Sequence, residues 1–228
     1  MIEKVKKEVY ELLKEDKSGH GMEHVNRVCD LSIKFAKAEN ADIEIVSLIA
    51  LLHDVDDYKL FGEENAKHLN NAKMIMNKVG VASEKQAKVL SAIHRLGYSK
   101  AVFGTRPESL EGQIVSDADM CDAVGVNGII RTFQYSMKFN KPFFDKDKFP
   151  KDSLTDSKII KSIADTSVCH LFEKILKLKN MMMTDSGRKE IEKRHNITVD
   201  ILYQLFDEEN APEWKKYLDN YLKENTKN

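Results

Sequence analysis

Residues 45–59 read IVSLIALLHDVDDYK, and the interpretation of the whole chain starts from this stretch. The apolar residues Ile45, Ile49 and Leu52 recur at the spacing of three or four that one buried face of a helix shows. Asp42 is the predicted N-cap of this helix. The run is too short to cross a bilayer. It therefore predicts a largely buried helix that ends in His-Asp-Val-Asp-Asp, residues 53–57.

The content of turn-forming residues is low for a chain of this length. The 228 residues include 10 Gly and 4 Pro, about half the combined share of roughly 12% that is usual. Because sandwiches and barrels need many chain reversals, the composition favours an all-α fold. We expect one domain, 1–228, with its motifs in residues 18–133 and C-terminal helices in 153–228. Helical spacing predicts helices at 2–14, from 18 through at least 36, and at 42–57, 62–80, 83–96, 110–137, 153–181, 186–195, 198–207 and from 212 onward.

The overall charge excludes some classes of partner. Lys plus Arg total 36 and Asp plus Glu total 37, which gives a net charge of −1. No global field would draw such a chain to a nucleic-acid polymer or to a membrane, and we expect neither partner. The N-terminus is rich in charged residues, unlike a signal peptide. Three cysteines without a CxxC pair fit a reducing compartment, so we expect a cytoplasmic protein.

The dipeptide His53-Asp54 suits a metal ion. Consecutive side chains on a helix point about 100° apart, so one ion can touch both. A carboxylate that is ionised in a buried setting also needs a counter-charge. His24 lies 29 residues before His53, and Asp119 lies 65 residues after Asp54. Both of these residues fall in segments with helical spacing.

The order His24, His53-Asp54, Asp119 resembles the HD superfamily of metal-dependent phosphohydrolases. Its flanks, HGMEHVNRV at 20–28, DADMCDAVG at 117–125 and RTF at 131–133, look like one bacterial branch that includes nucleotide pyrophosphohydrolases. The resemblance covers roughly residues 18–133. It implies an all-α HD-type bundle with the metal between helices and a C-terminal helical extension.

The resemblance also implies the ligand set: His24, His53, Asp54 and Asp119, with Asp117 as the alternative to Asp119. Two imidazoles and two carboxylates suit Mn²⁺, Mg²⁺, Ni²⁺, Co²⁺ or Fe²⁺ in octahedral geometry. Two coordination positions then remain for water and a substrate oxygen. We expect one divalent ion per subunit. A second metal ion, with His68 and His94 as additional ligands, is less favoured.

Asp57 is the predicted general acid or base. It follows His53 by four residues and Asp54 by three, so on a continuous helix it would be a direct neighbour of both. The same offset carries the acid in many HD hydrolases. Asp56, which would neighbour only His53, is the alternative.

Several residues are predicted to contact the substrate. The cations Arg27, Lys59 and Arg131 fit phosphate groups. Asp122, one turn after Asp119, is expected to orient the substrate or support a ligand. His94 is expected to line the pocket. A further histidine, His195, is predicted to close the C-terminal end of a helix.

The predicted function is hydrolysis of a nucleotide-like phosphoanhydride by metal-activated water, with a nucleoside triphosphate pyrophosphohydrolase favoured. Alternatives are a phosphomonoesterase or a phosphodiesterase that uses the same site. Two alternatives are not enzymes. One is a nucleotide sensor without catalytic activity, and the other is a structural domain whose metal ion only holds its helices together. The expected partner is a phosphorylated small molecule, and a homodimer remains one option.

Overall fold

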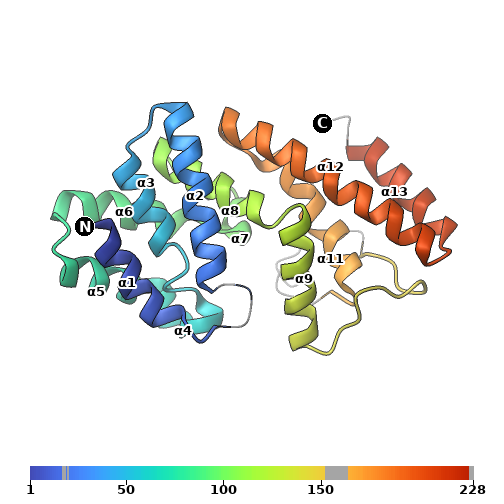
Figure 1. Ribbon diagram of the computed structural model, residues 1–228, viewed down its shortest axis with the longest axis horizontal. Helices are drawn as coiled ribbons and strands as arrows, with labels where there is room; N and C mark the ends of the chain where they lie inside the picture. The colour runs from blue at the N-terminus through green and yellow to red at the C-terminus, as the bar shows by residue number, and fades with distance from the viewer. Residues whose placement is uncertain (17–18, 20, 152–163, 226–228) are drawn as a thin grey trace. The chain divides into compact units, whose positions relative to one another are not determined.

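The computed structural model describes residues 1–16, 19, 21–151 and 164–225, without the side chain of Lys59 (Figure 1). The described residues form helices and irregular segments and no strand, which confirms the all-α class. They divide into two compact units, residues 1–122 with 183–187 and residues 123–182 with 188–228. The single domain stays a prediction. In the described part of the chain, no helix is both long and apolar enough to span a membrane.

The first unit is a bundle around one buried helix, α3 (Ile43–Leu52). Every residue from Ile45 to Leu52 is buried. The carboxylate of Asp42 caps α3 by accepting hydrogen bonds from two backbone amides, as predicted. Figure 1 shows the helices around it, of which α1, α2, α6 and α8 contact α3. The other helices are α1 (Ile2–Leu13), α2 (Met22–Glu39), α4 (Tyr58–His68), α5 (Asn70–Val79), α6 (Ser83–Arg95), α7 (Tyr98–Val102) and α8 (Leu110–Asp122).

The second unit has a core of aromatic side chains around Trp214. The indole of Trp214 is fully buried and stacks on Phe149, while its Nε1–H donates to the carbonyl of Lys146 at 3.0 Å. These contacts fasten the irregular segment 140–151 to the core. The elements of this unit are α9 (Val126–Lys138), α11 (Ser167–Glu173), the 3₁₀ helix η1 (Ile175–Met181), α13 (Pro212–Asn225) and most of α12 (Asp185–Glu208).

The prediction of one helix over 62–80 is wrong, because the chain divides it into α4 and α5 at Leu69, whose φ is 52°. The carboxylate of Asp56 accepts hydrogen bonds from the amides of Asn71 and Ala72, each at 2.9 Å. These are the amides that a helix leaves unpaired in its first turn. A carboxylate that lies outside α5 in the sequence therefore sets where α5 begins.

The boundaries predicted around residues 125 and 196 have different outcomes. The expected bend in 110–137 occurs at Gly125, with φ 82°, and separates α8 from α9. The two helices expected at 186–195 and 198–207 are one continuous helix, α12, since residues 196–197 include no glycine or proline to stop it. His195 therefore lies inside a helix, and its predicted position at a helix end is wrong. Residues 152–163 of the predicted helix 153–181 lie outside the described residues.

Asp117 holds the segment 183–187 against α8 within the first unit. Its buried carboxylate accepts hydrogen bonds from the amides of Met183 and Thr184 and from the hydroxyl of Thr184, at 2.7–3.0 Å. A Cβ on Gly187 would lie 2.3 Å from Oδ2 of Asp117, so only glycine fits there. The oxygens of Asp117 are thus engaged in structure, which favours Asp119 as the metal ligand.

Candidate metal centre

Three mutually packed helices bring the predicted metal ligands together. His24 lies in the first turn of α2, and His53 is the C-cap of α3 with Asp54 directly after it. Asp119 lies in α8. The helices α2, α3 and α8 contact one another in pairs. The site therefore lies where these three helices pack against one another.

The ligand atoms converge on a single point. The Nε2 atoms of His24 and His53 are 3.2 Å apart. Oδ2 of Asp54 lies 3.4 Å from each of these nitrogens, and Oδ1 of Asp119 lies 3.4 and 3.9 Å from them. Ligands about 2.1 Å from an octahedral ion are about 3.0 Å apart in adjacent positions. The observed separations are close to that spacing.

Hydrogen bonds fix which imidazole nitrogens can bind a metal. Nδ1 of His53 lies 2.8 Å from the carbonyl oxygen of Ala50, which only accepts. Nδ1 of His24 lies 2.7 Å from the carboxylate of Asp122. Both Nδ1 atoms are therefore donors, and the two Nε2 lone pairs face each other. A cation between them removes this repulsion and also balances the charges of Asp54 and Asp119, so the residues fit a divalent metal ion.

The centre is closed on its histidine side and open on its carboxylate side. The side chains of His24 and His53 are 2% and 3% exposed, whereas that of Asp119 is 30% exposed. Burial by itself would raise the pKa of Asp119, but its contacts with His24 and His53 lower that pKa below its ordinary value. Asp119 is therefore an ionised carboxylate that a substrate can approach.

Asp122 and Arg27, both predicted to contact substrate, are bonded to each other. Nε and Nη2 of Arg27 donate to the two oxygens of Asp122 at 2.7 and 3.0 Å. The same carboxylate, 2% exposed, accepts from His24. Asp122 was expected either to orient the substrate or to support a metal ligand. Its hydrogen bond with His24 fits the second role. The contact of either residue with substrate stays a prediction.

The helical argument for Asp57 is wrong, because α3 ends at Leu52 and the chain turns before α4. The amide of Asp57 donates to the carbonyl of Asp54 at 3.1 Å. This hydrogen bond ties the backbone of Asp57 to that of a predicted ligand. The carboxylate of the alternative, Asp56, is engaged in capping α5. Asp57 stays the predicted acid or base.

The other predicted substrate residues differ in burial and in the unit to which they belong. The side chain of Lys59 lies outside the described residues. Arg131 lies on α9 of the second unit, half-buried. The side chain of His94 is exposed, and that of His68 pairs with Glu64 at the surface. Within the described residues, His24, His53 and Asp119 form the one candidate metal cluster.

Lys100 is a cation near the site that the sequence did not single out. Its Nζ donates to the carbonyl of His94 at 2.6 Å. Burial lowers the pKa of Lys100, while the charge of Asp57 acts in the opposite direction. The one signal in the sequence is that Lys100 lies in the segment 97–109, which has no clear helical spacing.

Comparison with known proteins identifies the family. Residues 21–124 match the model of the HD domain. The sequence is 31% identical to Bacillus subtilis YpgQ over 206 residues, which cover 89% of this chain and 91% of YpgQ. The chain belongs to the HD-domain superfamily. The sequence-based assignment to this superfamily and to its metal-dependent phosphohydrolases is thereby confirmed.

Solved structures agree with this HD-domain assignment. A Lactobacillus plantarum protein is 30% identical with a TM-score of 0.79, and the match covers 92% of this chain and 97% of that one. An HD-superfamily hydrolase of Bacillus thuringiensis is 31% identical with a TM-score of 0.70, at the same coverage. YpgQ in complex with ADP is 28% identical with a TM-score of 0.68, and covers 91% of this chain and 94% of that one.

Proposed function

We propose that this HD-superfamily phosphohydrolase cleaves a phosphoanhydride bond of a nucleotide, with a nucleoside triphosphate as the favoured substrate. The observation that carries the proposal is the pair of Nε2 lone pairs from His24 and His53, which face each other beside two carboxylates. A divalent ion held by His24, His53, Asp54 and Asp119 supplies a Lewis acid that polarises a phosphoryl oxygen and lowers the pKa of an attacking water.

The reaction needs a proton acceptor and groups that offset phosphate charge. In the proposed step, the oxygen of a water forms a bond to the α-phosphorus, and the bond from this phosphorus to the bridging oxygen breaks. Asp57 accepts the proton of the water and returns it to the pyrophosphate that leaves. Lys100, which interacts with Asp57, offsets phosphate charge there. Arg27, Lys59 and Arg131 are assigned the same role.

Support for a nucleotide comes from a relative. YpgQ has been crystallised with ADP, a nucleoside diphosphate. A site with several cations can offset more charge than one phosphate carries, which favours polyphosphates. The mixed nitrogen and oxygen ligands favour Mn²⁺ among the metals to be tried first.

Release of phosphate and of pyrophosphate from nucleoside mono-, di- and triphosphates, with Mn²⁺, Mg²⁺, Co²⁺, Ni²⁺ or Fe²⁺, tests the proposal. We expect pyrophosphate from triphosphates with at least one metal. Faster turnover of monophosphates would instead establish a phosphomonoesterase. Tight nucleotide binding without turnover under any metal would establish a sensor.

A further inference from the structure

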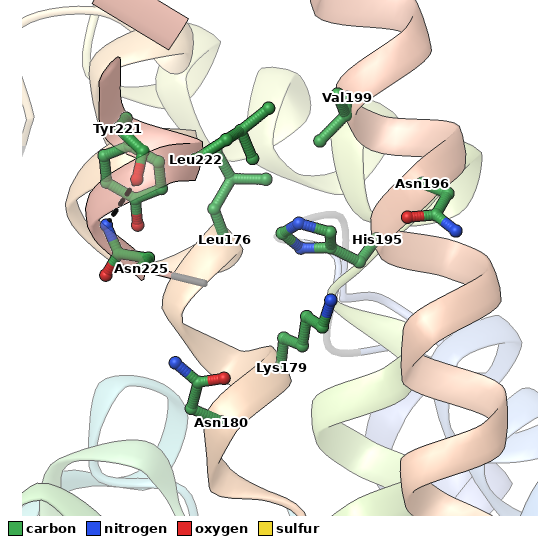
Figure 2. Close-up of a pocket in the computed structure, with 9 residues that line it drawn as sticks. All are labelled: Leu176, Lys179, Asn180, His195, Asn196, Val199, Tyr221, Leu222 and Asn225. Carbon is green, nitrogen blue, oxygen red and sulfur yellow. Dashed lines mark hydrogen bonds between the residues drawn. The ribbon is translucent and has the colours of Figure 1, made fainter. Parts of the chain in front are cut away.

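A cavity of ≈ 220 Å³ lies within the second unit, lined by residues of η1, α12 and α13. The described residues that line it are separate from those of the candidate metal centre. Its volume is below the roughly 300–1,000 Å³ of pockets for drug-sized ligands, so it suits a smaller molecule. Figure 2 shows Val199 and His195 projecting from α12, with Leu176 and Leu222 across from them and Lys179 reaching toward the ring of His195.

Nδ1 of His195 is a buried polar atom without a hydrogen-bond partner among the described residues. The side chain of His195 projects from α12 into this space (Figure 2), and the residue is 7% exposed. Burial first, and then the charge of Lys179, lower the pKa of His195 to about 4, although Glu192 acts in the opposite direction. The ring is neutral at neutral pH and offers one donor and one acceptor. A buried polar atom of this kind calls for a partner.

Lys179 supplies positive charge at the same end of the cavity. Its Nζ lies 2.8 and 3.0 Å from the two carboxylate oxygens of Glu192. This ion pair is partly exposed to solvent, so Glu192 holds the ammonium only weakly. An ammonium has three donors, which leaves Lys179 able to bind a second acceptor.

We propose that this cavity binds a small carboxylic acid, as its anion, with a compact apolar body. The carboxylate accepts hydrogen bonds from Lys179 and from the imidazole of His195. The apolar body contacts Leu176, Val199 and Leu222. Inorganic phosphate offers the charge without the apolar contacts, and an uncharged amide of the same shape offers the contacts without the charge. The site does not depend on the proposed phosphohydrolase activity.

The test uses the full chain loaded with Mg²⁺, with its histidines labelled at Cε1, and benzoate as the probe. The Cε1–H signal of His195 is assigned by its loss in His195→Gln and is followed by NMR through the titration. We expect a saturable shift with benzoate and at least tenfold weaker binding of benzamide. Inorganic phosphate at matched ionic strength should give no saturable shift. A shift that persists in His53→Ala does not come from benzoate bound at the metal centre.

Three variants complete the test. Lys179→Gln should weaken benzoate binding at least tenfold. Lys88→Gln removes a matched surface lysine, paired with Glu84 at 2.9 Å, and should leave binding unchanged. Val199→Phe fills the cavity from its apolar side and should abolish the shift. If one of the two cavity variants, Lys179→Gln or Val199→Phe, does not fold, the other still tests the proposal. The absence of a saturable shift in the unmodified chain, an equal response to phosphate, or unchanged binding in Lys179→Gln would overturn the proposal.

Discussion

The carboxylate of Asp122 lies 2.7 Å from Nδ1 of His24, although 98 residues separate them in the sequence. This contact makes Nδ1 the protonated nitrogen and turns the Nε2 lone pair toward the metal centre. Arg27 fixes the same carboxylate through two hydrogen bonds. The three side chains thus act as one unit, in which Asp122 and Arg27 position a metal ligand.

Asp122→Asn is expected to weaken metal binding. The amide keeps the shape of the side chain but lacks the negative charge that holds both His24 and Arg27. Partners that orient metal-bound histidines are typically worth about 10–100-fold in affinity. Calorimetric titration with Mn²⁺ measures the loss. Arg27→Gln leaves the bond between His24 and Asp122 in place, so it should cost less, and equal losses in the two variants would contradict this arrangement.

His53→Ala is expected to abolish metal binding and turnover together. Removal of one of two facing imidazoles leaves too few ligands, while the helix α3 keeps its buried face. Elemental analysis and calorimetry report the metal, and far-ultraviolet circular dichroism reports the helices. As a control, His68→Ala removes an exposed histidine paired with Glu64 and should change neither metal content nor turnover. Full metal content in His53→Ala would refute the ligand assignment.

Asp57→Asn is expected to lower the turnover number while the metal stays bound. The amide cannot accept the proton of water, and general acid–base groups typically contribute about 10²–10⁴-fold. Metal content and the turnover number are measured on one preparation. Lost metal would make Asp57 a ligand or a support of one. Near-normal turnover would make it a bystander.

Asp56→Ala is expected to destabilise the fold and leave the metal centre intact. The substitution leaves the amides of Asn71 and Ala72 without their acceptor at the start of α5. Unpaired buried groups cost about 1–3 kcal/mol. Urea unfolding gives the free energy of unfolding, and a Mn²⁺ titration of the folded variant gives the metal affinity. A large fall in metal affinity without loss of stability would place Asp56 in the site instead.

Apolar spacing and capping residues in the sequence predicted the helices whose ends depend on neighbouring residues. The apolar period of residues 45–52 and the cap at Asp42 predicted α3, because both act within one or two turns. The division of 62–80 at Leu69 could not be predicted in this way. A leucine with positive φ is unfavourable by itself, and it is tolerated where Asp56 caps the helix that follows.

The helical class, the superfamily and the residue types of the candidate metal centre could be predicted from the sequence, since His24, His53, Asp54 and Asp119 follow a recognisable order. How these residues are held depends on tertiary contacts that the sequence does not reveal. The roles of Asp122 at His24 and of Asp117 at Thr184 depend on contacts between segments 98 and 67 residues apart. Periodicity reports which face of a helix is buried, but only the packing of α2, α3 and α8 determines which buried atoms meet.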